Sequence, residues 1–150
     1  MKCNHGAELL PNIEEIKNKP ESVCPVDWAK RVADTARMNN CGKSVTCRDG
    51  MNQLWTIIND ITIDKGQGED LELIKDICEA LMLSDGCDIA QNAAALINES
   101  VTAYYEEWNA HIKRHRCSAC VCEALAANMP AAPVRAEGET GTRRRRKKSE

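Results

Sequence analysis

The sequence predicts an all-α fold: a small helical bundle with a cysteine loop between helices and a disordered C-terminal tail. Apolar residues recur three and four positions apart over several long stretches, which is the pattern of helices with one buried face. No stretch alternates apolar and polar residues convincingly, as a half-buried strand would. With 150 residues, 43% of them hydrophobic, the chain is long enough for one domain with a buried core.

The helices follow in order from the spacing of the apolar residues. A short amphipathic helix is expected first, and Pro25, which suits a first helical turn, opens the second. The helices on either side of the glycine-containing break at residues 64–68 are expected to pair as an antiparallel hairpin. The last helix completes a bundle and returns its preceding loop to the cysteine loop. The expected helices cover residues 9–17, 25–40, 51–61, 71–81 and 97–112.

This organisation divides the chain into four segments. An N-terminal segment, residues 1–23, precedes the helical domain, residues 24–116, which carries the cysteine loop. A cysteine-rich extension covers residues 117–128. Prolines and glycines interrupt every pattern in residues 129–150, where we expect a disordered basic tail.

Composition indicates where such a chain would work. It contains no run of about eighteen apolar residues, so no membrane span is expected. The first residues lack the apolar stretch of a secretory signal, and the default location is therefore cytoplasmic. In a reducing compartment, nine cysteines indicate metal binding or redox chemistry rather than disulfides, and the odd number agrees with this.

The loop that contains Cys41, Ser44 and Cys47 is the most informative part of the sequence. Cys87 follows forty residues after Cys47. An iron–sulfur cluster needs closely spaced ligand positions and one distant position, because a short loop can wrap three corners while another element supplies the fourth ligand. Ser44 occupies one of the close positions. The pattern therefore predicts an iron–sulfur site.

The chain resembles a known family from about residue 24 to residue 122. The resemblance rests on Cys-Gly-Lys-x-x-x-Cys-Arg-x-Gly at residues 41–50 and on Cys-x-x-x-Gln-x-Ala at residues 87–93. It is similar to the C-terminal iron–sulfur domain of the NADH-binding flavoprotein subunit of respiratory complex I. Related domains occur in the β-subunits of NAD-linked and electron-bifurcating hydrogenases. In that family the loop has the sequence Cys-Gly-x-Cys-x-x-Cys-Arg.

The resemblance implies a ligand set for the cluster. In the family, the three loop cysteines and the later cysteine hold a [4Fe–4S] cluster that takes electrons from flavin. Cys41, Cys47 and Cys87 match three of these ligands, and Ser44 stands where the fourth is expected. We therefore expect a [4Fe–4S] cluster, or a [3Fe–4S] cluster if Ser44 leaves one corner empty.

The resemblance also implies an electron-transfer function. In the family, a domain that binds flavin and NADH comes before the iron–sulfur domain, and no glycine-rich nucleotide loop occurs in residues 1–40. We expect no flavin, no NAD and no catalytic site in this chain. It would relay electrons from a partner subunit that binds FMN and NADH to a downstream iron–sulfur or redox subunit. The alternative is a non-redox adaptor that kept the fold, or a zinc-binding interaction module.

A second group of potential ligands lies near the C-terminus. Cys117, Cys120 and Cys122 follow His111 and His115, and these thiols and imidazoles would be within reach of one ion. We expect a metal at the three cysteines, with zinc as the candidate. An idle linker is the alternative, because the spacing matches no closed structural zinc pattern. The segment also resembles the one that joins this domain to a ferredoxin-like extension in the bifurcating hydrogenases.

The remaining cysteines carry weaker predictions. Cys78 lies on the apolar face of its helix, and we expect it in the core. Cys3, His5 and Cys24 flank the first helix and would be able to close a further metal site. Residues 143–148 are all basic in a chain whose remainder is acidic. Since no aromatic residues interleave with them, we expect a solvated tail and no nucleic-acid partner.

Overall fold

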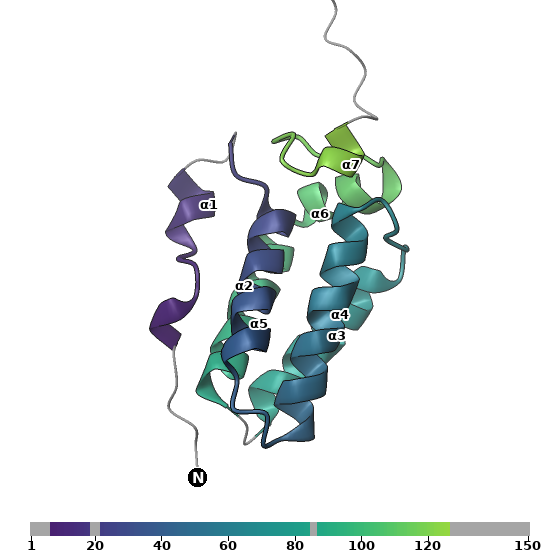
Figure 1. The fold of residues 1–150 in the computed structure, drawn as a ribbon. Coiled ribbons are helices and arrows are strands. Elements are labelled where there is room, and N and C mark those ends of the chain that lie inside the picture. The colour runs from purple at the N-terminus through teal and green to yellow at the C-terminus, as the bar shows by residue number, and fades with distance from the viewer. Residues whose placement is uncertain (1–6, 19–21, 85–86, 127–150) are drawn as a thin grey trace, which may run out of the picture.

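The computed structural model describes residues 7–18, 22–84 and 87–126 (Figure 1). Within these ranges the chain forms helices and no strand, so the predicted all-α bundle is confirmed. The predicted disordered tail, residues 129–150, lies outside the described residues. The elements are η1 (Ala7–Leu9), α1 (Glu14–Asn18), α2 (Pro25–Asn39), α3 (Val45–Thr62), α4 (Asp70–Leu83), α5 (Asp88–Ala103), α6 (Tyr105–Lys113) and α7 (Glu123–Ala126).

Helices α2 to α5 form a four-helix bundle in which α2 packs on α3 and α5, and α4 packs on α3 and α5. Successive helices run in opposite directions, so α3 and α4 form the expected antiparallel hairpin (Figure 1). The α2–α3 and α4–α5 connections therefore lie at one end of the bundle, which we call the cysteine-loop end. The start of α2, the end of α6 and α7 lie at the opposite end (Figure 1).

The core combines apolar side chains from all the longer helices. The largest fully buried side chains include Trp28, Met51, Leu54, Ile58, Ile74, Ile97 and Trp108. A polar connection crosses the core near the start of α2: the Trp108 indole Nε1 donates to Ser100 Oγ over 3.4 Å, and Ser100 Oγ donates to the Pro25 carbonyl over 3.3 Å. It ties α6, α5 and α2 together.

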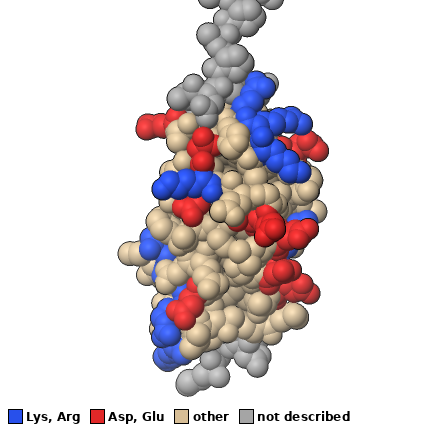
Figure 2. Space-filling model, turned by 90° about the vertical axis from the view of Figure 1, so that its right-hand side faces the viewer, with Lys and Arg blue, Asp and Glu red and all other residues tan. Residues whose placement is uncertain are grey.

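The described parts of the flanking segments pack on this core as well. Ile16 of α1 and Leu125 of α7 are both fully buried. No helix in the described ranges is long and apolar enough to cross a membrane. Figure 2 shows the face on the α3 and α4 side, where uncharged side chains fill the middle and acidic side chains gather toward one edge.

Two expected helices are interrupted in the structure. The helix expected over residues 9–17 is a 3₁₀ turn followed by α1, because Pro11 lacks the amide that would continue a helix. The Glu14 amide instead donates to Asn12 Oδ1 over 3.0 Å. The helix expected over residues 97–112 is divided at Tyr104, whose backbone conformation (φ −118°, ψ 36°) separates α5 from α6. Helices α3 and α5 start earlier than the expected residues 51 and 97, at Val45 and Asp88, because the apolar stripes of the sequence do not extend through their first turns.

Gly50 allows α3 and α4 to approach closely. A Cβ atom at this position would lie 3.1 Å from Leu81 Cδ2. We expect Gly50→Leu to force the two helices apart and to lower the free energy of unfolding by about 1–3 kcal/mol, measured by urea denaturation. Gly68→Ala is the control, because no heavy atom lies within 4 Å of its Cβ position. Equal stability of the two variants would contradict the observed α3–α4 packing.

Candidate functional site

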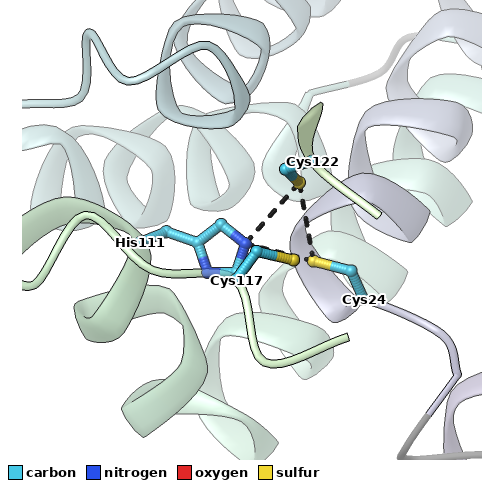
Figure 3. A group of neighbouring side chains, drawn as sticks. All are labelled: Cys24, His111, Cys117 and Cys122. Carbon is cyan, nitrogen blue, oxygen red and sulfur yellow. Dashed lines mark hydrogen bonds between the residues drawn. The ribbon is translucent and has the colours of Figure 1, made fainter. Parts of the chain in front are cut away.

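Four buried side chains meet at the end of the bundle where α2 begins (Figure 3). The ligand atoms of Cys24, His111, Cys117 and Cys122 all lie within 4.8 Å of one another. His111 Nε2 is 3.2 Å from Cys24 Sγ and 3.7 Å from Cys122 Sγ, and the two sulfurs are 3.9 Å apart. With Zn–S bonds of about 2.3 Å and a Zn–N bond of about 2.0 Å at tetrahedral angles, the ligand atoms of one zinc ion lie about 3.5–3.8 Å apart, close to these three distances. The group therefore has the composition and spacing of a tetrahedral single-ion site.

Three separate parts of the chain position these ligands. Cys24 is the residue before the first turn of α2, where Pro25 fixes the helix start. His111 lies in the last turn of α6, and its Nδ1–H donates to the Glu107 carbonyl over 2.7 Å. This bond leaves Nε2 facing the thiols, as a metal-ligating histidine requires once Nε2 has lost its proton. Cys117 and Cys122 come from the segment between α6 and α7.

Without a metal, the three thiols of this group have very different pKa values. Hydrogen bonds from Cys122 and Cys24 hold the pKa of the Cys117 thiol far below its usual range. The hydrogen bond between Cys24 and Cys117 raises the pKa of the Cys24 thiol far above its usual range. The hydrogen bond between Cys122 and Cys117 raises the pKa of the Cys122 thiol to about 12. Burial lowers the pKa of His111, but the Cys117 and Cys24 sulfurs outweigh it and raise that pKa to about 10. One thiolate therefore faces a protonated imidazole, and a metal ion would have to displace the remaining protons.

The sequence predicts a metal at Cys117, Cys120 and Cys122. The structure brings Cys117 and Cys122 together with Cys24 and His111. Cys120 is exposed, has a backbone φ of 55° and is not a member of the group. Cys24 lies 98 residues before Cys122, so no local spacing links the two.

The other predicted ligands near these residues have different surroundings. His115 Nδ1 pairs with the Asp64 carboxylate on the surface, away from the buried group. Cys3 and His5, which the sequence suggests as partners of Cys24, lie outside the described residues. Cys78 is fully buried in the core, as expected, and burial raises its pKa to about 12.

The predicted cluster residues lie at the cysteine-loop end. Cys41 is in the α2–α3 loop, Ser44 precedes the first turn of α3, and Cys47 lies in that turn. Cys87 precedes the first turn of α5. Cys47 and Cys87 are buried and Cys41 packs half-buried against the same core. The 15-residue helix α2 separates Cys41 from Cys24 by about 22 Å, at 1.5 Å per residue, so the two groups of residues cannot share an ion.

This end suits an iron–sulfur cluster in the chemistry of its donors. Cys47 and Cys87 lie at the starts of α3 and α5, where unpaired amides and the helix dipole favour a negatively charged group such as a bound cluster. Ser44 makes no capping hydrogen bond with its side chain, although serine commonly does so at this position in a helix. Three thiols are thus available for iron corners through sulfur, and the Ser44 hydroxyl would be the oxygen donor if it faces the fourth position.

Gln91, the glutamine of the Cys-x-x-x-Gln-x-Ala motif, stabilises the cysteine-loop end of the bundle. Gln91, in the first turn of α5, donates a hydrogen bond from Nε2 to the Ser84 carbonyl at the end of α4. This bond ties the residues on either side of the α4–α5 connection together and so fixes the approach to Cys87. The glutamine of Cys-x-x-x-Gln therefore has a structural role.

Comparisons with known proteins match the part of the chain that carries these elements. Residues 27–111 match the NADH-ubiquinone oxidoreductase-F iron–sulfur binding region. The HndC subunit of the NADP-reducing hydrogenase of Solidesulfovibrio fructosivorans is 32% identical over 105 residues, which is 70% of this chain and 21% of that protein. The F subunit of the NADH-quinone oxidoreductase of Streptomyces coelicolor is 31% identical over 97 residues, 65% of this chain and 22% of its own length. The F 2 subunit of the NADH-quinone oxidoreductase of Rhizobium meliloti is 30% identical over 99 residues, which is 65% of this chain and 23% of that protein.

The four buried ligands Cys24, His111, Cys117 and Cys122, which we call the Cys24 group, lead to a prediction about zinc. We expect the full-length chain to bind one zinc ion in this group, and Cys24→Ala and His111→Ala to lose it, as measured by chelator competition. Cys120→Ala is the matched control and should retain the ion, because Cys120 lies outside the group. Since His111 and Cys122 have pKa values of about 10 and 12, both are protonated at pH 7, and apparent zinc affinity should rise with pH. Full zinc binding by both ligand variants would contradict the assignment.

Proposed function

Because this chain belongs to the family of the NADH-ubiquinone oxidoreductase-F iron–sulfur binding region, we propose that it relays electrons between a flavoprotein and a further redox protein. Family membership confirms the iron–sulfur cofactor that the cysteine loop predicted. It also makes the chain an iron–sulfur component of the kind found in NADH-linked oxidoreductases. The direction and partners of electron transfer are part of our proposal.

We assign the cluster to Cys41, Cys47 and Cys87, with Ser44 at the fourth position. The observation that carries the assignment is that these residues lie at the cysteine-loop end and within the matched region, residues 27–111. Either a [4Fe–4S] or a [3Fe–4S] cluster is compatible with three thiolates and one hydroxyl.

The chain contributes binding, shielding and electrostatics. When bound, an iron–sulfur cluster supplies one-electron chemistry over a range of potentials set by its surroundings. The thiols of Cys47 and Cys87 are 0% and 1% exposed, so the protein keeps water away from them. The amide-rich helix starts beside them favour the negative charge of a bound cluster. Cys41 is half-buried and lies on the more open side of the site.

Partner proteins complete the proposed function. The chain spans about a fifth of the length of these relatives, so the activities in their names involve much more sequence than this match covers. We propose that a partner subunit that binds FMN and NADH supplies the electrons. A downstream iron–sulfur or redox subunit would accept them.

The buried Cys24 group favours a second, structural role. A zinc ion held by Cys24, His111, Cys117 and Cys122 has no open position and no redox chemistry, so it would join α2, α6 and the C-terminal segment without carrying electrons. We propose that this ion acts beside the cluster. A zinc-binding adaptor without a cluster is the rival function, and such a protein would be colourless.

Two buried cysteines provide a matched test of the cluster assignment. Cys47 and Cys78 are both fully buried on core-facing helices, but only Cys47 belongs to the proposed ligand set. We expect anaerobically purified parent protein to be brown, Cys47→Ala to lose iron and visible absorption, and Cys78→Ala to keep both. Retention of full iron by Cys47→Ala would reject this ligand, and a colourless parent protein would favour the adaptor.

Ser44→Cys tests the fourth position. A fourth thiolate would hold the iron that the hydroxyl binds weakly, since iron in clusters prefers sulfur ligands. We therefore expect a slower loss of cluster absorption in air, and a [4Fe–4S] signal in electron paramagnetic resonance after reduction. An unchanged rate and spectrum would show that position 44 does not face the cluster.

A further inference from the structure

Asn40 links the end of α2 to the loop that follows it. Its backbone amide donates to the Ala36 carbonyl over 2.9 Å and closes the helix. Its side-chain Nδ2 donates to the Arg37 carbonyl over 2.9 Å and to the Ala36 carbonyl over 3.2 Å. The Asn40 Oδ1 atom then accepts the Gly42 amide over 2.9 Å. The amide group of one side chain therefore bonds the helix on one side and the loop on the other.

The Gly42 backbone is held from two directions. Gly42 has a φ of 65°, a left-handed conformation that other residues adopt only with strain. Its amide bonds to Asn40, and its carbonyl accepts from Arg48 Nη1 over 3.4 Å. Arg48 is adjacent to Cys47, and its Nε also pairs with Asp49 over 3.1 Å. The loop is thus tied to α2 by Asn40 and to α3 by Arg48.

This arrangement determines where the cluster ligands of the loop can lie. Cys41 stands between Asn40 and Gly42, whose relative positions the Asn40 side chain fixes. The same bond engages the Gly42 amide, so this amide is not available to donate to a cluster sulfur. Hydrogen bonds to sulfur are one of the factors that set a cluster's potential. Asn40 therefore bears on both the geometry and the electrostatics of the site.

We propose that Asn40 is a positioning residue, which holds the Cys41 loop in its ligand-ready form and withholds the Gly42 amide from the cluster. This inference rests on the proposed cluster at Cys41, Cys47 and Cys87. Asn40 touches the loop backbone and acts on the cluster only through Cys41 and Gly42. Residue type matters here, because the role needs a side chain that donates to α2 and accepts from Gly42 at once.

Asn39 offers a matched control for the neighbouring asparagine. Its Nδ2 donates to the Thr35 carbonyl over 2.8 Å, so it also bonds the end of α2, but the bond stays within the helix. Asn39→Ala removes a helix-end hydrogen bond and leaves Gly42 untouched. Asn40→Asp keeps the acceptor for the Gly42 amide but cannot donate to the Ala36 and Arg37 carbonyls, so it separates the two halves of the role.

The first readout needs no cluster. In the metal-free full-length chain, hydrogen exchange at the Gly42 amide should be about fivefold faster in Asn40→Ala, as expected for the loss of one hydrogen bond. It should be unchanged in Asn39→Ala and intermediate in Asn40→Asp, which keeps the acceptor for Gly42 and loses the bonds to α2. Equal exchange in all four proteins would overturn the proposal.

The second readout uses the cluster-loaded chain. In air, Asn40→Ala should lose cluster absorption several times faster than Asn39→Ala, with its potential shifted from the parent value, while Asn40→Asp should lose absorption at an intermediate rate. Identical loss rates and potentials in the two alanine variants would also overturn the proposal. If the parent chain holds no iron under anaerobic conditions, the electron-transfer function fails, and the exchange of the Gly42 amide alone decides whether Asn40 positions the loop.

Discussion

The packing of α2 against α3 and α5 is the contact on which both candidate sites depend. Helix α2 carries Cys24 immediately before its first turn and the Cys41 loop immediately after its last. Its buried face combines Trp28 with three fully buried alanines, Ala29, Ala33 and Ala36, and the small side chains let the neighbouring helices approach closely. A shift of α2 would therefore displace a ligand at each end of the bundle.

The two ends differ in the chemistry they can support. At the end where α2 begins, four ligand atoms converge tightly enough for a single ion, and a bound metal would replace the His111 proton as the positive charge beside the buried sulfurs. At the cysteine-loop end, the ligands come from a loop and two helix starts, which suits a multi-iron cluster whose ligands bind different irons. One site would thus stabilise the fold and the other would carry electrons.

Much of this arrangement is predictable from local sequence. Apolar spacing locates the longer helices and places Cys78 in the core, because burial of one helix face imposes that spacing. The interruptions at Pro11 and Tyr104 do not follow from the spacing alone. Cys24 is the ligand with the weakest support in the sequence, since it meets Cys122 only through tertiary packing. Proximity in the chain groups Cys120 with Cys117, but the turn between them directs Cys120 to solvent.

The most direct test of two separate metal centres is a crystal structure of the anaerobically purified chain with anomalous diffraction measured at the iron and zinc absorption edges. We predict an iron peak beside Cys41, Cys47 and Cys87, and a zinc peak enclosed by Cys24, His111, Cys117 and Cys122. Iron located only in the Cys24 group, with no anomalous peak at the cysteine-loop end, would contradict the assignment of the two sites.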